Sequence, residues 1–435
     1  MPTSDRYPNP TAGPTAGPTA EPTADPSADP SAGTSADADP FAATRARFAL
    51  PEGVLYLDGN SLGPPPAGVA ERVAGRVREE WGERLIRGWN DSGWMVEPER
   101  VGSRIGRLIG AWEDSVVVGD TLSIRLFQAL DAALARHPGR PLVLSDTGNF
   151  PSDLYMAEGL LRRLGGERRL ELVAPEAVAA RLDDSVAVLM LTHVDYRSGR
   201  LHDMAALTEA AHALDIPVVW DLAHSSGALE VDLAGVDADF AVGCTYKYLN
   251  GGPGAPAFIA VNPRRQEAIE PLLAGWLGHA EPFAFEPRYR PAPGVARLRV
   301  GTPPVLAMAA LDAALDVWDG IDMGAVRARS IALSERFVAE VEARCPALSL
   351  ASPRDPRARG SQVSFAFEHG YAAMRALIER HGVIGDFRAP DLMSFAFTPL
   401  YLSMYDVLAA VDAIEAVVRE RQWDDPAYRE RAAVT

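Results

Sequence analysis

The chain has 435 residues, of which 47% are hydrophobic, and carries a formal net charge of −17. This length allows two domains, and the acidic balance disfavours nucleic acid or an anionic membrane as a partner. The two cysteines, Cys244 and Cys345, provide no disulfide framework and fit a cytoplasmic protein. No apolar run reaches the roughly 18 residues that span a bilayer, and the N-terminus lacks the apolar stretch of a signal peptide.

The first 40 residues are a low-complexity segment. Proline recurs at every fourth position from Pro10 to Pro30, in units such as TAGP and SADP. Proline, glycine and small polar side chains bury too little surface to offset the loss of chain entropy. We therefore expect residues 1–40 to be a disordered tail that carries no chemistry.

The ordered part is predicted to begin near Phe41 with a short strand and two helices. The strand covers 54–57, and the helices cover about 67–81 and 99–111. Three tryptophans lie in or near the first helix, and they either pack in the core or line an aromatic substrate pocket: Trp81, Trp89 and Trp94.

Between residues 100 and 250 the pattern alternates between helices and strands. The strands are nearly continuous apolar runs, as in SVVV, PLVL, SVAVLML, IPVVW and DFAV. Such strands, joined by helices, are typical of an α/β fold with a mainly parallel sheet that is buried on both faces. Functional residues of these sheets collect at the carboxyl ends of the strands, and polar residues follow each apolar run here.

The C-terminal part mixes helices and strands in a different way. The expected elements are helices at 306–318, 325–344, 372–381 and 403–420, and strands at 361–369 and 394–399. This α+β pattern predicts a second, smaller domain. The expected organisation is therefore a tail over 1–40, a large domain over 41–305 and a small C-terminal domain over 306–435.

Lys247 is the only lysine in the chain, although lysine and arginine together number 42. Codon bias explains the general use of arginine for positive charge. A lysine amine, unlike a guanidinium group, can lose its proton and attack a carbonyl. Because Lys247 lies between an apolar run and the glycine-rich segment 250–254, we interpret it as a Schiff-base lysine at the end of a strand.

Other residues fit a pyridoxal phosphate site around this lysine. A carboxylate at Asp221, after the preceding apolar run, would keep the pyridine nitrogen protonated. The GDTLS segment at 119–123 is predicted to open a helix, whose backbone N–H groups bind phosphate. Phe150 and His224 are candidates to lie against the ring. Each feature alone is also compatible with a purely structural role, as a strand-end or helix cap or as a core residue.

Metal-binding motifs are absent from the sequence. The eight histidines show no HExxH or HxH spacing, and there is no CxxC pair. We therefore predict no metal ligands.

Seven motifs together resemble those of the kynureninase family: LDGNSLGPPP at 57–66, FPSD at 150–153, WDLAHSSGA at 220–228, TYKYLNGGPG at 245–254, GWLGH at 275–279, GTPP at 301–304 and TPLYLSMYDV at 398–407. The resemblance covers about residues 50–425. It implies the aspartate aminotransferase fold and pyridoxal 5'-phosphate as cofactor. It also implies hydrolysis of L-kynurenine, or L-3-hydroxykynurenine, to anthranilate, or 3-hydroxyanthranilate, and L-alanine, in tryptophan catabolism and the kynurenine pathway to NAD.

The resemblance also implies roles for individual residues. The catalytic group would be Lys247, Tyr246 and Asp221. The cofactor would be held by Leu122, Ser123, Phe150, Pro151, Ser152, Asp153, Thr192, Asp221, His224, Tyr246 and Lys247. In a homodimer with shared active sites, the neighbouring subunit would add Trp276 and Thr302 near the phosphate. The aromatic amino-acid substrate would contact Asn60, Ser61, Arg388 and Ser394.

One position departs from the family pattern. The resemblance leads us to expect an arginine for the substrate carboxylate just before TPLY, where this chain has Ser394. Replacing a bidentate arginine by a hydroxyl costs on the order of 2–3 kcal/mol of binding. Either Arg388, six residues upstream, compensates, or the substrate differs at its carboxylate end.

Three alternatives to the family reaction stay open at this point. The chain could be a related lyase or hydrolase acting on a modified kynurenine-like substrate, or a paralogue that keeps the fold without catalysis. A cysteine desulfurase would need a reactive cysteine in a mobile loop. Cys244 is expected inside a strand and Cys345 after a helix, which disfavours that activity.

Overall fold

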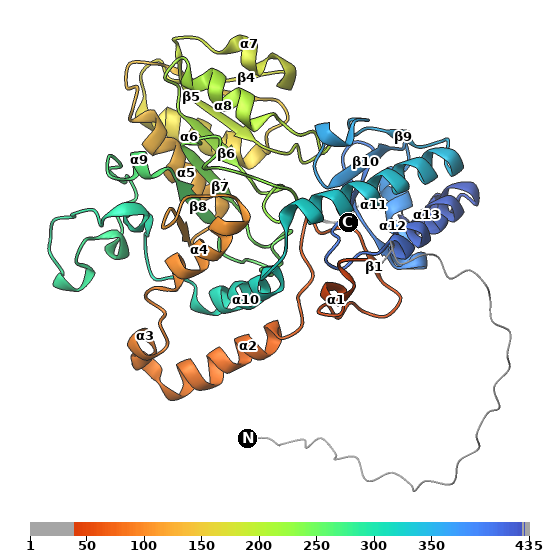
Figure 1. The fold of residues 1–435 in the computed structure, drawn as a ribbon. Coiled ribbons are helices and arrows are strands. Elements are labelled where there is room, and N and C mark those ends of the chain that lie inside the picture. Colours follow the sequence, from red (N-terminus) through yellow and green to blue (C-terminus); the bar gives the residue numbers. More distant parts are fainter. Residues whose placement is uncertain (1–38, 429, 431–435) are drawn as a thin grey trace, which may run out of the picture. The chain divides into compact units, whose positions relative to one another are not determined.

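The computed structural model describes residues 39–428 and residue 430 (Figure 1). The expected disordered tail over 1–40 therefore lies almost entirely outside the described residues. From Phe41 onward the chain forms one compact unit. The division of this unit at residue 305 into a large and a small domain stays a prediction.

A seven-stranded sheet forms the centre of this unit. Its strands, in spatial order, are β2 (Val116–Val118), β8 (Phe258–Val261), β7 (Phe240–Gly243), β6 (Val218–Asp221), β5 (Val186–Thr192), β3 (Leu142–Asp146) and β4 (Arg169–Val173). The five strands from β7 to β4 are parallel, whereas β8 is antiparallel to both β7 and β2. The expected mainly parallel sheet is confirmed.

Helices bury both faces of this sheet, as the apolar runs predicted. One hydrophobic cluster joins Val219 of β6 to residues of α5 (Leu122–Leu134) and α6 (Pro151–Leu164). The neighbours Val218 and Trp220 point to the opposite face and join a second cluster. Side chains alternate between the two faces of a strand, so a strand covered on both sides is apolar at every position.

A second sheet lies in the C-terminal part. It has four strands in the order β12 (Asp386–Arg388), β13 (Leu392–Ala396), β10 (Gln362–Ala366) and β9 (Ser349–Leu350), all antiparallel. Three helices lie beside it (Figure 1): α11 (Met323–Arg344), α12 (Gly370–His381) and α13 (Met404–Arg419). The capping box of α13, with Ser403 and Asp406, fixes where that helix begins.

The remaining elements connect or flank the two sheets. They are α1 (Ala42–Arg45), α2 (Val69–Gly75), the π-helix η1 (Arg76–Glu83), α3 (Gly88–Asp91), α4 (Glu97–Leu108), α7 (Val178–Arg181), α8 (Met204–His212), α9 (Pro263–Gln266) and α10 (Val305–Leu315). Strand β1 (Leu55–Tyr56) pairs in parallel with β11 (Val383–Ile384). This pairing brings the N-terminal segment to the C-terminal part of the chain. Of the described helices, none is long and apolar enough to cross a membrane.

The three tryptophans near α2 have different environments. Trp94 is buried and its indole N–H donates to Glu80, while Trp89 packs edge-on against it. Trp81 is 55% exposed. None of the three lines the cavity described below. Core packing, rather than a substrate pocket, therefore describes Trp89 and Trp94.

Candidate active site

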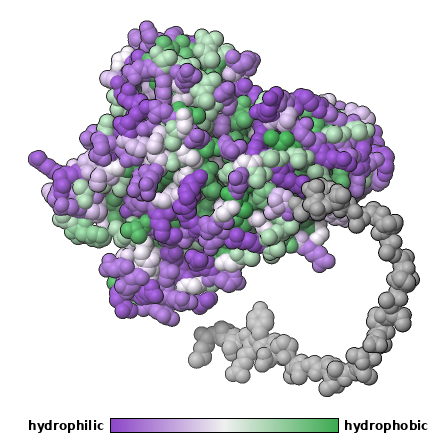
Figure 2. Space-filling model, in the orientation of Figure 1, coloured by the Kyte–Doolittle hydropathy of each residue, from purple (hydrophilic) through white to green (hydrophobic). Residues whose placement is uncertain are grey.

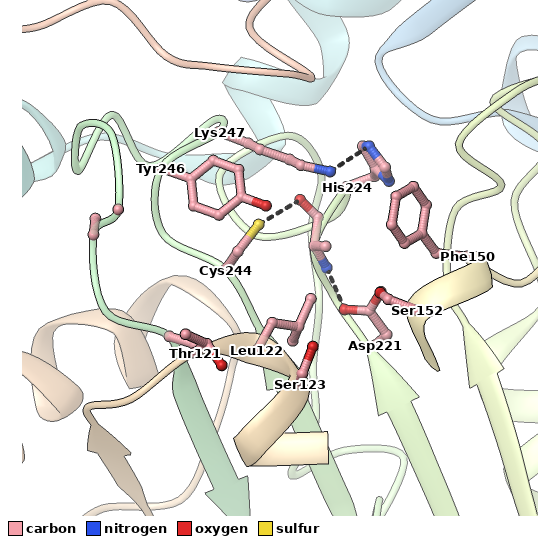
Figure 3. A pocket seen from close by; sticks show the side chains of 14 residues that line it. Thr121, Leu122, Ser123, Phe150, Ser152, Asp221, His224, Cys244, Tyr246 and Lys247 are labelled. Carbon is pink, nitrogen blue, oxygen red and sulfur yellow. Dashed lines mark hydrogen bonds between the residues drawn. The ribbon is translucent and has the colours of Figure 1, made fainter. Parts of the chain in front are cut away.

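A cavity of about 280 Å³ opens at the carboxyl ends of the central strands (Figure 3). It is lined by Thr121, Leu122, Ser123, Phe150, Ser152, Asp221, Ala223, His224, Cys244, Tyr246, Lys247, Gly254, Ala255 and Ala257. Eight of these are residues that the sequence predicted for the cofactor site. They come from the starts of α5 and α6, from the last residue of β6 and from the loops after β6 and β7.

Lys247 projects its amine into this cavity from a turn. The sequence analysis expected Lys247 at the end of a strand. Strand β7 instead ends at Gly243, and Lys247 lies in the turn that follows it. The amine donates to the ring nitrogen Nε2 of His224 at 2.8 Å. Burial and the lysine charge hold the pKa of His224 well below its ordinary value. His224 is therefore a neutral acceptor that fixes the direction of the amine.

The turn that carries Lys247 is pressed against the N-terminal segment. A Cβ atom on Gly63 would lie 2.1 Å from the backbone oxygen of Lys247, and only glycine fits this contact. The N–H of Gly63 also donates to the backbone oxygen of Tyr246, at 2.7 Å. Asn250, in the left-handed region at φ +60°, closes the turn and donates from its side chain to Pro64. The LDGNSLGPPP and TYKYLNGGPG motifs therefore form one packed unit.

Two buried carboxylates lie near one another, and of the two only Asp221 lines the cavity. Asp221 accepts hydrogen bonds from the backbone N–H of Ala223 at 2.9 Å and from the Thr192 hydroxyl at 3.4 Å. Asp153 is 1% exposed, and neither of its carboxylate oxygens accepts a well-formed hydrogen bond from the described residues. Burial and the charge of Asp221 raise the pKa of Asp153. A cationic N–H group placed here would relieve both carboxylates, as a pyridinium does.

The start of α5 forms another wall of the cavity. Its N-cap residue, Thr121, makes no side-chain hydrogen bond to the helix, so the N–H groups of the first turn are not satisfied by a cap. Thr121, Leu122 and Ser123 all line the cavity. An anion at this position would gain from these N–H groups and from the helix dipole. This geometry favours the phosphate interpretation of GDTLS over an ordinary side-chain cap.

Aromatic side chains flank the lysine amine. The amine lies 5.9 Å from the ring centre of Phe150 and 6.0 Å from that of Tyr246. Phe150 is held at the start of α6 by Asn149, whose side chain accepts from its backbone N–H at 2.7 Å. Pro151, the first residue of α6, fixes the backbone there without lining the cavity. The Cys244 sulfur lies beside the Tyr246 hydroxyl, and with burial it raises the pKa of Tyr246 (Figure 3).

The four residues predicted to contact substrate lie together on the N-terminal segment and the C-terminal sheet. Ser61 donates to Asp386 at 2.9 Å, and Arg388 forms an ion pair with the same carboxylate at 2.5 Å. Ser394 lies on β13 directly opposite Asp386 of β12, and its buried hydroxyl has no partner among the described residues. Asn60 is fully buried, and both polar atoms of its side chain are likewise unpartnered.

Two residues that were predicted to bind the cofactor lie outside this cavity. Trp276 is 42% exposed and packs edge-on against Phe283. Thr302 lies in a separate small cleft beside Gly119 and Asp120. Neither residue lines the cavity that contains Lys247.

The structure also brings in residues that the sequence analysis did not assign to the cofactor or substrate. Thr121, Ala223, Cys244 and the 254–257 loop line the cavity, and they are neighbours of predicted residues in the chain. Tyr196 contacts Phe150, with ring centres 4.9 Å apart, and also lies against Arg388. Its position just after the polar end of β5 is the one feature of the sequence that could have indicated Tyr196 as a site residue. Asp386 could have been found through its position two residues before Arg388.

Comparison with known proteins identifies the family. The chain is 49% identical over 404 residues to the kynureninase of Burkholderia mallei strain SAVP1, which covers 91% of this chain and 97% of that protein. The kynureninase of Pseudomonas fluorescens is 47% identical, with the same coverage. Residues 326–414 also match the kynureninase C-terminal domain. The chain belongs to the kynureninase family.

The fold of this kynureninase family member is shared with solved structures of other enzymes. The cysteine desulfurase CsdA of Escherichia coli superposes with a TM-score of 0.72 at 19% identity, covering 87% of this chain and 98% of that one. The lyase C-DES, solved with glycine linked to its pyridoxal phosphate cofactor, gives a TM-score of 0.73 at 16% identity, covering 85% and 98%. These likenesses confirm the expected aspartate aminotransferase-like fold.

The cofactor expected for a kynureninase family member is pyridoxal phosphate, and the residues present fit it. An amine for its aldehyde, buried carboxylates for its ring nitrogen and a helix start for its phosphate lie around one cavity. The chain is therefore a pyridoxal-phosphate-dependent hydrolase of the kynureninase type. When bound, this cofactor stabilises negative charge that develops next to the substrate nitrogen.

Proposed function

We propose that this protein hydrolyses L-kynurenine, or its 3-hydroxy derivative, to anthranilate, or 3-hydroxyanthranilate, and L-alanine in the kynurenine pathway of tryptophan catabolism. The observation that carries the proposal is the cavity around Lys247, with buried carboxylates at one side and the start of α5 at another. This arrangement occurs in a chain that is 49% identical to a kynureninase over 91% of its length.

The proposed reaction breaks the bond between Cβ and the carbonyl carbon of the substrate and consumes one water. The hydroxyl of the water joins the carbonyl carbon to give the aromatic acid, and a hydrogen joins Cβ to give alanine. Lys247 would hold the cofactor, and its amine is proposed to remove the proton from Cα of the bound substrate. His224, at 2.8 Å, supports this role because it directs the lysine amine.

Tyr246 is proposed as the proton donor or relay at Cβ. Its phenol lines the cavity, with its ring centre 6.0 Å from the lysine amine. A phenol is protonated at neutral pH, as a proton donor requires, and Cys244 and burial raise the pKa of Tyr246 further. Asp221 and Asp153 are proposed to hold the ring nitrogen of the cofactor, while Leu122 and Ser123 hold its phosphate.

Arg388 is proposed to bind the α-carboxylate of the substrate in place of the arginine that the family pattern leads us to expect at Ser394. Strands β12 and β13 are paired neighbours, with Asp386 opposite Ser394, and Arg388 is two residues along β12 from Asp386. Residues two apart on a strand share a face, so Arg388 and Ser394 lie on the same face of the sheet. The Arg388 side chain is 29% exposed, and its Nε has no partner among the described residues.

A second candidate is hydrolysis of a kynurenine-like substrate that is modified at its carboxylate. Ser394 favours it, because this hydroxyl cannot form the bidentate pair of an arginine. The charge of Arg388 is also shared with Asp386. A panel of L-kynurenine, its methyl ester and its amide distinguishes the candidates by which compound has the highest kcat/KM.

A cytoplasmic homodimer with shared active sites is proposed as the working form. Both cysteines are buried and free, which suits a reducing compartment. Several apolar side chains are exposed in and around the 272–285 segment: Leu272, Trp276, Phe283 and Phe285. In Figure 2 hydrophobic residues are interspersed among hydrophilic ones over the visible face. Exposed aromatic side chains support an interface with a second copy, through which Trp276 and Thr302 would reach the partner's phosphate site.

The test of the function is the formation of anthranilate from L-kynurenine by the purified, cofactor-loaded protein, followed by fluorescence. Rapid formation supports the proposal. A protein that binds the cofactor but forms no anthranilate or 3-hydroxyanthranilate contradicts it and directs attention to the second candidate. In that case Ser394→Arg shows whether an arginine on β13 restores the reaction.

A further inference from the structure

Tyr196 is the aromatic residue that lies between the cofactor cavity and Arg388. Its ring packs edge-on against Phe150, with centres 4.9 Å apart and planes at 81°. On its other side, the central guanidinium carbon of Arg388 lies 5.9 Å from the Tyr196 ring centre. Phe150 in turn lies 5.9 Å from the lysine amine. The four side chains Lys247, Phe150, Tyr196 and Arg388 form a continuous row, which we call the aromatic row.

The backbone of Tyr196 is fixed by the C-terminal sheet. Its carbonyl oxygen accepts from the side chain of Gln362 on β10 at 2.9 Å. The next carbonyl, of Arg197, accepts from the Ser364 hydroxyl at 2.5 Å. Gln362 and Ser364 are both fully buried, so the two donors are held in place by the packing around β10. Tyr196 therefore lies in the loop that follows β5, and its main chain is hydrogen-bonded to β10.

The loop around Tyr196 is also rigid by itself. The carboxylate of Asp195 accepts from the backbone N–H groups of Arg197 at 2.8 Å and Ser198 at 2.7 Å. Gly199, with φ +72°, closes the loop, and a Cβ there would lie 2.8 Å from the backbone oxygen of Gln362. The ring of Tyr196 consequently has a fixed base from which to contact its two neighbours.

The guanidinium of Arg388 has few other constraints on its direction. Asp386 pairs with it at 2.5 Å, and the Ser61 hydroxyl lies 3.4 Å from it. Asp386 is on the same strand and pulls the guanidinium along β12. The face of an aromatic ring attracts a cation, so Tyr196 draws it toward the cavity instead. Because Phe150 holds the Tyr196 ring edge-on, the ring attracts the guanidinium from a fixed position.

We propose that Tyr196 is a positioning residue, which orients Arg388 so that an anionic group of the substrate is held at a set distance from Lys247. The inference rests on the proposed function in that Arg388 is taken as the residue that binds the substrate carboxylate. The ligand class that the aromatic row fits is an aromatic compound that also carries a carboxylate, as the proposed substrate does. Its flat ring packs on aromatic side chains and its carboxylate pairs with the oriented arginine.

The test compares Tyr196→Leu, Tyr196→Phe and the control Tyr405→Leu, which changes a tyrosine that is 79% exposed on α13. Tyr196→Leu is expected to raise KM for L-kynurenine about tenfold and to leave kcat and the cofactor absorbance nearly unchanged. Tyr196→Phe keeps the ring and is expected to restore the low KM. A fall in kcat or loss of the cofactor spectrum with unchanged KM would overturn the proposal, because Tyr196 would then serve the cavity itself.

A double-mutant cycle tests whether Tyr196 acts through Arg388. If it does, Tyr196→Leu added to Arg388→Gln raises KM little beyond Arg388→Gln alone. Independent, multiplying effects would contradict the proposal.

Binding of 3-benzoylpropionate separates this inference from the proposed function. The compound is an aryl ketone with a carboxylate and no amine, so it occupies the substrate site without reacting. Calorimetry is expected to show weaker binding to Tyr196→Leu and to Arg388→Gln, and no such loss for its carboxamide. If the wild type forms no anthranilate but shows this pattern, the function fails and the inference stands. If anthranilate forms and the probe binds Tyr196→Leu as well as the wild type, the inference fails and the function stands. A wild type that binds no probe contradicts the inference.

Discussion

At the scale of single residues, Lys247 and its hydrogen-bond partner His224 lie at the proposed reacting end of the site. Lys247 is 9% exposed and its amine points at a neutral imidazole, so the amine is held as a directed donor instead of sampling solvent. Since no other lysine exists in the chain, no neighbouring amine can replace it.

Substitution of Lys247 tests this directly. Lys247→Ala and Lys247→Arg are both expected to abolish absorbance above 400 nm in the presence of pyridoxal phosphate and to stop turnover, because neither side chain forms the covalent bond. Absorbance spectra and anthranilate fluorescence measure the two effects. Full activity of Lys247→Arg would contradict the assignment of the lysine.

Asp58 provides a pH-dependent contribution to stability. Burial and the charge of Asp386 raise the pKa of Asp58 from 3.8 to about 7. Between these two values the folded protein holds a proton that the unfolded chain has released, so stability is greatest below this window and falls as pH rises through it.

We expect Asp58→Asn to flatten this decline, by on the order of 3 kcal/mol between pH 4 and 8. Urea unfolding at several pH values measures the free energy of unfolding. Asp184→Asn, an exposed change of equal charge, is the control and should leave the slope unchanged. An Asp58→Asn curve parallel to the wild type would show that this carboxylate is not perturbed.

Individual residues of the site differ in how far the sequence could predict them. Lys247 and Asp221, which line one cavity, could be proposed because a unique lysine, and a carboxylate placed directly after an apolar run, both stand out in the sequence. Tyr196 was missed, because its role depends on contacts with Phe150 and Arg388 from distant parts of the chain. Tyrosine in a loop has no spacing pattern that distinguishes it from ordinary packing.

At the scale of elements, the packed unit of the 57–66 segment and the Lys247 turn determines where the amine lies. Gly63 is the closest contact, and an added methyl group would overlap the backbone oxygen of Lys247. Because that neighbour is backbone, it cannot move aside as a flexible side chain would.

Gly63→Ala is therefore expected to shift the lysine turn and to lower both cofactor affinity and turnover at least about tenfold. Gly139→Ala is the matched control, since an added methyl group there meets nothing within 4 Å. Cofactor titration by absorbance and thermal unfolding measure the effects. Normal cofactor binding by Gly63→Ala would show that the turn tolerates the overlap.

The sequence predicted most elements because their hydrophobic periods are long and unbroken. The helix expected at 325–344 begins two residues earlier in α11 and ends at the same residue. The helix expected at 67–81 instead becomes π-helical after Gly75. A π-helix depends on which side chains fill the widened turn, and the apolar period does not encode this. The pairing of β1 with β11 joins residues more than 300 apart and has no local signal.

At the scale of the whole molecule, the cavity of this chain contains only part of the proposed site. Lys247 is its one basic side chain apart from the histidine, although a phosphate would carry up to two negative charges. The exposed Trp276 and Thr302 are proposed to complete the site of a partner subunit.

Mixing two inactive proteins tests the shared site. Lys247→Ala and the double variant Trp276→Ala with Thr302→Ala are each expected to be inactive or nearly so. Random reassociation after mild unfolding produces mixed dimers with one intact site, and about a quarter of the wild-type activity should return. Light scattering measures the oligomer, and anthranilate fluorescence measures the activity. Absence of recovery in a dimer that does exchange subunits would place both residues in their own subunit's chemistry.

Because Lys247 is the only lysine in the chain, cleavage by a protease can report whether the cofactor is bound to it. An endoproteinase that cuts after lysine can cleave the unfolded chain at one peptide bond, giving residues 1–247 and 248–435. Borohydride reduction of the cofactor-loaded protein would make that lysine a secondary amine that the protease does not accept. The fraction of chain left uncut on a denaturing gel would then report cofactor occupancy, without a substrate or a spectrum.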